Sequence, residues 1–385
     1  MKRISVWPLR IKLKMLVPHG LPRIRVQHAA VCCALWLIPA ITWANPSLVT
    51  AAGAGTRNVT LLANPSQKID AAASADGQYS KPQQHHEASL RSWLQRVSQA
   101  AKDRNYSGVF VVQSGGRIVT STIDHYVVHG NTLERVETLD GQRRILVCHN
   151  AETRTILPDA RLIVVEDHHT DYSFPRMLKT PHADYATHYK LRHEGHERCA
   201  GYVCDVTRII PQDDLRYGYR LWTEQRSGLL VKAQTLNDLG KVLDQVAFTQ
   251  LDLNPKPRPD LISEALKGTS NYRIEHMRAS LSTPQAQGWA LSHPIPGFES
   301  VGIYKRRLML HGKPTEVTQW LFSDGLASVS LFAGPSADSH QPGASLHMGD
   351  TNALLARKGA WSVIVIGAVP AKTLQLFADS LKQLH

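Results

Sequence analysis

The fold is decided by the stretch Arg216–Leu253, which reads RYGYRLWTEQRSGLLVKAQTLNDLGKVLDQVAFTQLDL. Apolar and polar residues change at short intervals along it, and turn residues separate the apolar segments at Ser227–Gly228 and at Asp238–Gly240. Such a pattern is typical of short strands that are joined by tight turns. The stretch therefore predicts an antiparallel meander.

Both faces of this meander carry large side chains. Tyr217, Tyr219 and Leu221 fall on one face, whereas Trp222 falls on the other with the aliphatic parts of Arg216 and Arg220. A sheet with one apolar and one amphipathic face needs a second layer or an apolar ligand. We therefore expect the meander to form one wall of a ligand-holding half-barrel.

The region before the meander continues the same architecture. Leu90, Trp93, Leu94 and Val97 have the spacing of one helical face, which predicts an amphipathic helix that ends near Asp103. Glycine-containing turns then separate a series of short apolar segments. Strands are expected at 107–113, 117–129, 132–139, 143–149, 153–158, 161–166, 188–194 and 202–211. Hairpins without intervening helices indicate a many-stranded antiparallel sheet, and residues 167–185 interrupt it as a long loop.

A second unit follows a proline-rich segment. Asn254–Pro259 contains three alternating prolines, which prevent both helix and sheet pairing and predict a stiff linker. Further strands are expected at 299–305, 307–310, 316–323, 326–333, 352–357 and 361–368. A helix is expected from Pro370, because Leu374, Phe377 and Leu381 share one face. The chain of 385 residues is also long enough for two domains.

The amino-terminal region resembles an export signal. Residues 1–44 contain seven Lys and Arg residues, no acidic residue and the apolar run Ala29–Ala44. Small residues at Thr42 and Ala44 predict cleavage after Ala44. The run is short for a membrane span and Pro39 interrupts it, so an uncleaved anchor is the less favoured alternative. Translation from Met1 or from Met15 stays open.

Charge gives little support to nucleic-acid binding. The formal net charge is +12, but the chain beyond residue 44 has 37 basic and 32 acidic residues, a net charge of +5. No run of basic residues with interleaved aromatics occurs in it. We therefore expect no nucleic-acid partner. Residues 45–86 are rich in Ala, Ser, Gln, Gly and Pro, which predicts a disordered tether.

Three cysteines remain outside the signal region. Cys199 and Cys204 bracket four residues, so a hairpin could bring them to disulfide distance. Two reduced, buried thiols are the equally favoured alternative. Cys148 is expected to be buried.

No catalytic or metal-binding constellation is found. His193, Glu194 and His196 lack the spacing of a helical zinc site, and no other histidine group meets the ligand-spacing test. Asp140, Asp213, Asp214 and Asp324 lie at expected turns, where aspartate is common. We therefore predict neither an enzyme nor a cofactor.

An apolar binding cavity is the remaining hypothesis. A many-stranded antiparallel sheet with a helix and a partly apolar loop can enclose such a cavity. The candidate lining residues are Trp93, Phe110, Phe174, Met177, Tyr217 and Tyr219. The alternative is that these side chains belong to an ordinary core.

Several motifs, in this order, resemble those of the MucB/RseB family. They are Asn105–Tyr106, Leu139–Arg144, Arg216–Trp222 with Ser227–Leu230, Pro296–Phe298 and Phe322–Leu326. The ordered set covers about residue 88 to the end and is more specific than any single motif.

The resemblance implies a mainly β (α+β) fold with two domains. The larger would be an unclosed antiparallel β-barrel similar to the lipoprotein carriers LolA and LolB, with helices on its concave side; the smaller would be an antiparallel sheet with a carboxy-terminal helix. The expected organisation is a signal peptide (1–44), a tether (45–87), a LolA-like lipid-sensing domain (88–253), a Pro-rich linker (254–282) and an anti-sigma-binding domain (283–385).

The resemblance also implies a periplasmic negative regulator of the envelope-stress sigma factor. Such a protein binds the periplasmic region of the anti-sigma factor RseA or MucA and shields it from proteolysis until lipid or lipopolysaccharide acyl chains relieve the shielding. We expect the partner to contact Arg306, Arg307, Trp320 and Phe322, because Arg and aromatic residues dominate binding hot spots. The alternatives are a core Trp with solvated arginines, and a periplasmic lipid or lipoprotein carrier. Homodimer formation stays open.

Overall fold

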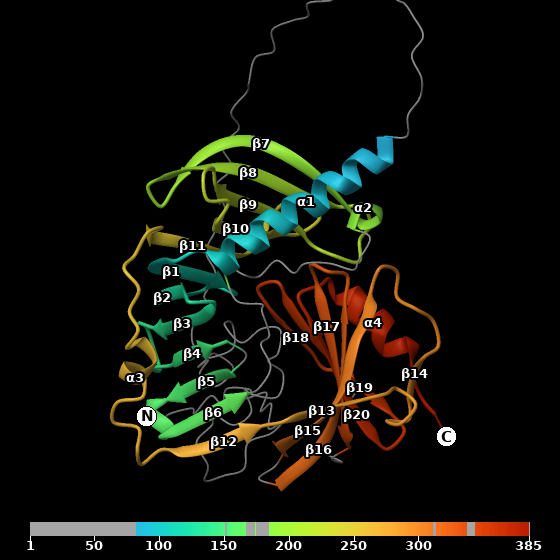
Figure 1. Ribbon diagram of the computed structural model, residues 1–385. Helices are drawn as coiled ribbons and strands as arrows, with labels where there is room; N and C mark the ends of the chain where they lie inside the picture. Colours follow the sequence, from blue (N-terminus) through green and yellow to red (C-terminus); the bar gives the residue numbers. More distant parts are fainter. Residues whose placement is uncertain are drawn as a thin grey trace, which may run out of the picture.

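The computed structural model describes residues 82–150, 152–166, 174, 185–310, 313–336 and 343–384. The predicted signal peptide, most of the tether and Met177 lie outside these residues. The described part forms two large sheets side by side, with a separate two-stranded ribbon (Figure 1). None of its helices is long and apolar enough to cross a membrane.

The large domain is a single curved sheet with the order β12-β6-β5-β4-β3-β2-β1-β11-β10-β9-β8-β7. Its strands are β1 (Tyr106–Ser114), β2 (Arg117–Val128), β3 (Asn131–Thr138), β4 (Ile145–His149), β5 (Glu152–Leu157), β6 (Leu162–Glu166), β7 (Tyr189–Cys199), β8 (Tyr202–Pro211), β9 (Gly218–Glu224), β10 (Leu230–Leu236), β11 (Val242–Asp252) and β12 (Arg273–Met277). A short α2 (Tyr185–His188) precedes β7, and a 3₁₀ turn (Pro158–Ala160) precedes β6. The predicted meander is confirmed as β9, β10 and β11.

The amphipathic helix α1 (Pro82–Asp103) lies across the concave side of the large sheet (Figure 1). Its apolar stripe Leu90, Leu94, Val97 and Ala101 is buried against residues of β1 and β8–β11. The helix ends at Asp103, as its sequence predicts, but begins at Pro82, inside the range assigned to the tether.

The segment assigned to the linker is folded beyond Asp260. It forms α3 (Leu261–Ala265), β12 and β13 (Ala279–Ser282). The apolar side of α3 packs on a small core that includes Ile145 and Ile163. The chain then returns beside β6 in the same direction, so β6 and β12 pair in parallel. The large sheet is therefore mixed, which corrects the expectation of a wholly antiparallel one.

The small domain is an antiparallel sheet with the order β13-β15-β16-β17-β20-β19-β18. Its other strands are β15 (Glu299–Leu310), β16 (Lys313–Ser323), β17 (Ser328–Pro335), β18 (Ser345–Met348), β19 (Thr351–Lys358) and β20 (Trp361–Gly367), and α4 (Ala371–Ser380) packs on one face. A separate ribbon pairs β14 (Trp289–Leu291) with β21 (Leu381–Gln383). The strands expected at 299–305 and 307–310 are one continuous strand, because β13 and β16 both pair along β15.

Candidate functional site: the interface between the domains

Arg216 joins the two domains from a fully buried position. It precedes β9, and its Nε donates to Asp324 Oδ2 at 2.7 Å in the turn between β16 and β17. Nη2 donates to the carbonyl oxygen of Pro296 at 2.8 Å, and Nη1 pairs with Asp213. The guanidinium thus binds three acceptors, two of them in the small domain. A planar fork of donors suits such a contact, which a lysine could not reproduce.

Asp324 is the acceptor that organises the other side of this contact. Its Oδ2 also accepts a hydrogen bond from Tyr189 Oη at 2.8 Å. Its Oδ1 accepts from the backbone N–H groups of Leu326 at 2.9 Å and Ala327 at 2.7 Å. Burial raises the pKa of Tyr189 well above its usual value, so the phenol keeps the proton that it donates. The carboxylate therefore closes its own turn and holds the large domain at the same time.

Aromatic rings and a glycine complete the surroundings of Arg216. The guanidinium carbon lies 5.1 Å from the centre of the Phe298 ring and 5.7 Å from that of Tyr189. Gly297 has a φ of +76°, and a Cβ there would lie 2.6 Å from Arg216 Nη2. A side chain at Gly297 would thus displace the guanidinium. The three motifs Arg216–Trp222, Pro296–Phe298 and Phe322–Leu326 meet at this one contact.

A second set of contacts joins the domains at the turn between β18 and β19. Asp350 Oδ2 accepts from Thr235 Oγ1 at 2.9 Å, and Asn352 Nδ2 donates to Tyr217 Oη at 3.1 Å. At the start of α4, Thr373 Oγ1 donates to the carbonyl oxygen of Leu215 at 2.6 Å. The interface is therefore polar and hydrogen-bonded, and separating the domains would exchange these hydrogen bonds for hydrogen bonds to water.

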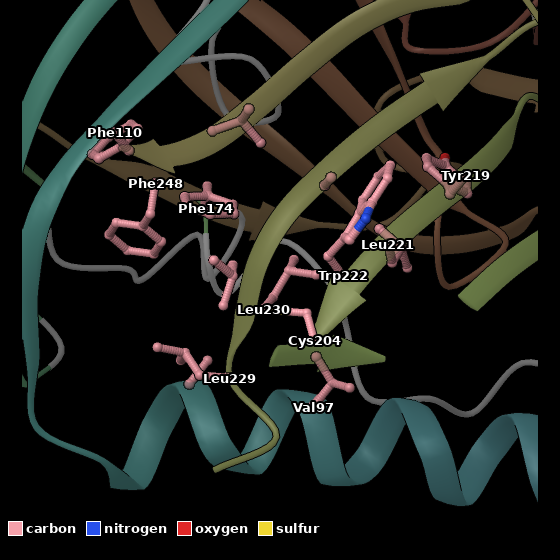
Figure 2. Close-up of a cluster of buried hydrophobic side chains, with 14 of the residues drawn as sticks. Val97, Phe110, Phe174, Cys204, Tyr219, Leu221, Trp222, Leu229, Leu230 and Phe248 are labelled. Atoms are coloured by element: carbon pink, nitrogen blue, oxygen red, sulfur yellow. The ribbon is translucent and has the colours of Figure 1, made fainter. Parts of the chain in front are cut away.

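The predicted cavity residues do not form one group. Phe110 and Phe174 are buried in the core of the large domain, where their ring centres are 5.7 Å apart, and Phe248 lies 5.0 Å from Phe174 (Figure 2). Tyr219 belongs to the same core, and Trp93 packs against its edge. A lipid-lining role for these side chains stays a prediction.

Tyr217 lies at the domain interface instead, through its bond with Asn352. Its neighbour in the sequence motif, Tyr219, is buried in the core, where desolvation raises the pKa of its hydroxyl well above the usual value. The alternation of side chains along the strand places Tyr217 and Tyr219 on the same face of the sheet. It does not indicate which part of that face the small domain covers.

The predicted partner residues are divided between core and surface. Trp320 and Phe322 are buried in the core of the small domain, where Trp320 Nε1 donates to Ser300 Oγ at 2.8 Å. Arg306 is half-buried and Arg307 is exposed on β15. Partner binding by these residues stays a prediction, but the two aromatic side chains expose little surface for it.

Cys199 and Cys204 are both free thiols in this structure. They are diagonal neighbours on the β7–β8 hairpin, since Cys199 lies opposite Tyr202 and Cys204 lies opposite Glu197. The contact with Cys204 lowers the pKa of the Cys199 thiol. A disulfide between them stays a prediction. The expected burial of Cys148 is confirmed.

The predicted turn at Asp324 is confirmed, but its sequence context does not indicate an interdomain role. Arg216 is expected on the amphipathic face of the meander, whereas it is fully buried. The signal that could have found them is that both belong to the family motifs. Across the described ranges, no cluster of three or more metal-ligating side chains exists.

Comparison with known proteins covers both domains. The family description "MucB/RseB N-terminal domain" matches residues 89–267, and "MucB/RseB C-terminal domain" matches residues 283–382. The sigma factor AlgU regulatory protein MucB of Pseudomonas aeruginosa is 28% identical over 300 residues, which are 77% of this chain and 91% of that protein. The sigma-E factor regulatory protein RseB of Escherichia coli K12 is 23% identical over 297 residues, which are 75% and 89%.

Solved structures extend this likeness to the arrangement of the chain. A crystal structure of MucB in complex with MucA(peri) is 26% identical with a TM-score of 0.60, and the match covers 76% of this chain and 98% of that one. A crystal structure described as MucB is 25% identical with a TM-score of 0.55, and the match covers 77% and 98%.

Proposed function

This chain belongs to the MucB/RseB family, and on that premise we propose that it binds the periplasmic region of a membrane anti-sigma factor similar to MucA. Binding would take place in the periplasm after export. Two findings support the proposal: the curated relatives are named as sigma-factor regulatory proteins, and MucB has been solved in complex with MucA(peri).

The observation that carries this proposal is the convergence of three family motifs on the Arg216–Asp324 contact. Residues of one domain that only stabilised its own core would not need partners in the other. The contact instead holds the two domains in one relative placement. A partner that contacts both domains would then recognise this placement.

Shielding and release would follow from linkage between two binding events. We propose that the bound anti-sigma segment is protected from regulated proteolysis, and that lipid or lipopolysaccharide acyl chains relieve this protection. If the acyl chains favour a domain arrangement that binds the segment less well, each ligand must weaken the other by the same factor.

A titration tests this function directly. The affinity of the purified protein for the anti-sigma periplasmic region would be measured by calorimetry with and without lipopolysaccharide. A parallel protease assay would follow cleavage of the anti-sigma region. We expect slower cleavage in the presence of the protein, and weaker binding with lipopolysaccharide present. Unchanged affinity would refute lipid release, and absence of binding would refute the proposed partner.

Charge reversal on β15 tests where the partner binds. Arg306→Glu/Arg307→Glu is expected to weaken binding of the anti-sigma region about tenfold or more, because hot-spot arginines commonly contribute over ~1.4 kcal/mol. Arg104→Glu/Arg117→Glu is the matched control, since both residues are exposed on the large domain and the change in net charge is the same. Equal affinities of the two variants would move the partner site away from β15.

A further inference from the structure

Two carboxylates from different domains lie together inside the interface. Asp244 is near the start of β11 and is 7% exposed, and Asp350 is in the turn between β18 and β19 and is 8% exposed. Asp350 accepts hydrogen bonds from Thr235 Oγ1 at 2.9 Å and Thr351 Oγ1 at 3.1 Å. Asp244 is different: Ser114 and Asp350 lie beside its carboxylate, but within the described residues neither of its oxygens, nor the hydroxyl of Ser114, makes a hydrogen bond of good geometry.

The packing around Asp244 is close and crosses the domain boundary. Gly349 precedes Asp350 in the small domain and has a φ of +61°. A Cβ at Gly349 would overlap both Asp244 Oδ1 and Ser114 Oγ of the large domain. On the same side, a Cβ at Gly115 would lie 2.9 Å from Met348 Cγ. The backbone of the β18–β19 turn therefore lies in close contact with the Asp244 carboxylate.

The groups that surround this pair supply no compensating charge. From the large domain, β1 contributes Ser114, the residue before β9 is Tyr217, and the β10–β11 turn contributes Asp238. Lys241, in the same turn, is exposed to solvent. From the small domain, His347 Nδ1 is hydrogen-bonded to Asn352 Oδ1 at 2.7 Å. Within the described ranges, neither Asp244 nor Asp350 forms an ion pair with Lys, Arg or His.

Two ionised carboxylates cannot remain together in such a place. Their mutual repulsion and the loss of water favour a single negative charge that is stabilised by one proton. A proton on Asp244 would also let its carboxyl group donate a hydrogen bond to the carboxylate of Asp350. Burial, followed by the charge of Asp350, raises the pKa of Asp244 to about 8. Because the two groups interact, that value belongs to the pair rather than to one side chain.

We propose that Asp244 and Asp350 form a proton-binding site shared by the two domains, and that loss of its proton weakens the docking of one domain on the other. This site goes beyond the proposed function and does not depend on it.

The direction of the pH dependence follows from proton linkage. In the separated or unfolded chain each carboxyl group has its usual pKa of about 3.9, whereas the docked pair keeps one proton up to about pH 8. Between these values docking takes up one proton. The stabilisation of domain docking by this pair is therefore complete below about pH 4. It decreases as the pH rises and is lost once the pH has passed about 8. Across this window the equilibrium constant for opening should rise about tenfold per pH unit.

The test is the pH dependence of urea unfolding for the purified protein, its Asp244→Asn variant and its Asp350→Asn variant. Asparagine keeps the shape of a protonated carboxyl and can donate to the remaining carboxylate. Between pH 5 and pH 7, the unfolding constant of the unmodified protein should rise about 100-fold more than that of Asp244→Asn. It should also rise clearly more than that of Asp350→Asn, in which Asp244 stays buried but no longer faces a second charge. The control is Asp140→Asn, an exposed turn residue whose pKa is lowered by hydrogen bonds from Thr120. This control should keep the full pH dependence.

Three results would overturn the proposal. The first is an unmodified protein and variants with the same pH dependence. The second is loss of the pH dependence in Asp244→Asn alone, which would place the proton within the large domain. The third is stabilisation by millimolar calcium that EDTA reverses and Asp244→Asn abolishes, because the pair would then hold a cation. If Asp244→Asn does not fold, the test rests on Asp350→Asn alone. The proposal is then refuted if Asp350→Asn shows the same pH dependence of unfolding as the unmodified protein.

Discussion

Replacing Asp324 by asparagine should lower the free energy of unfolding by about 3–5 kcal/mol, the usual cost of removing one partner of a buried ion pair. The substitution keeps an oxygen that can accept from Leu326 and Ala327, so the β16–β17 turn should survive. It replaces Oδ2 by an NH₂ group that would face two other donors, Arg216 Nε and Tyr189 Oη. We expect the lower end of this range, because Arg216 keeps its pairing with Asp213.

Urea unfolding at pH 7, followed by tryptophan fluorescence, measures this loss as a lower midpoint. A decrease below about 1 kcal/mol would refute the reasoning, because it would mean that the contact barely offsets its own desolvation. The double variant Arg216→Met/Asp324→Asn provides the internal control. Removing both charges should cost clearly less than the sum of the two single changes, because neither partner is left as an unpaired buried charge.

Three further changes test other parts of the structure. Gly297→Ala should lower the free energy of unfolding by about 1–3 kcal/mol in urea unfolding, since its φ of +76° and the nearby Arg216 both oppose a side chain; an unchanged midpoint would contradict this. Phe110→Ala should cost about 3–5 kcal/mol by opening a cavity beside Phe174, and a loss below 1 kcal/mol would instead indicate a site that tolerates vacancy, as a lipid-holding space would. Cys199→Ser should leave the urea midpoint unchanged under reducing conditions but lower it after oxidation if the predicted disulfide forms, and mass spectrometry of the unmodified protein reads the pairing directly.

Much of the fold could be predicted because its signals are local. β8 has the same range as the strand predicted at 202–211. β2 ends one residue before the end of the strand predicted at 117–129. Strand alternation and turn chemistry need only a few neighbouring residues, so they can be recognised without any tertiary information. The same is true of α4, whose apolar stripe determines the face that packs on the sheet.

The candidate site could not be predicted in the same way. Arg216 and Asp324 are 108 positions apart, and each is ordinary in its own segment. Trp320 and Phe322 have the composition of a binding hot spot, yet their strand buries them against α4. Residue type alone does not distinguish these outcomes, because burial depends on which element covers a face.

The sequence by itself determined the alternation of strands and turns, the two-domain organisation and the family, because these are carried by neighbouring residues and by motifs in a fixed order. Only the tertiary structure decided that β12 adds to the large sheet in parallel, that Arg216 joins the domains, and that Asp244 faces Asp350. The physical reason is that hydrogen bonds, desolvation and charge repulsion depend on distances in space, and chain folding brings these groups together across long separations in sequence.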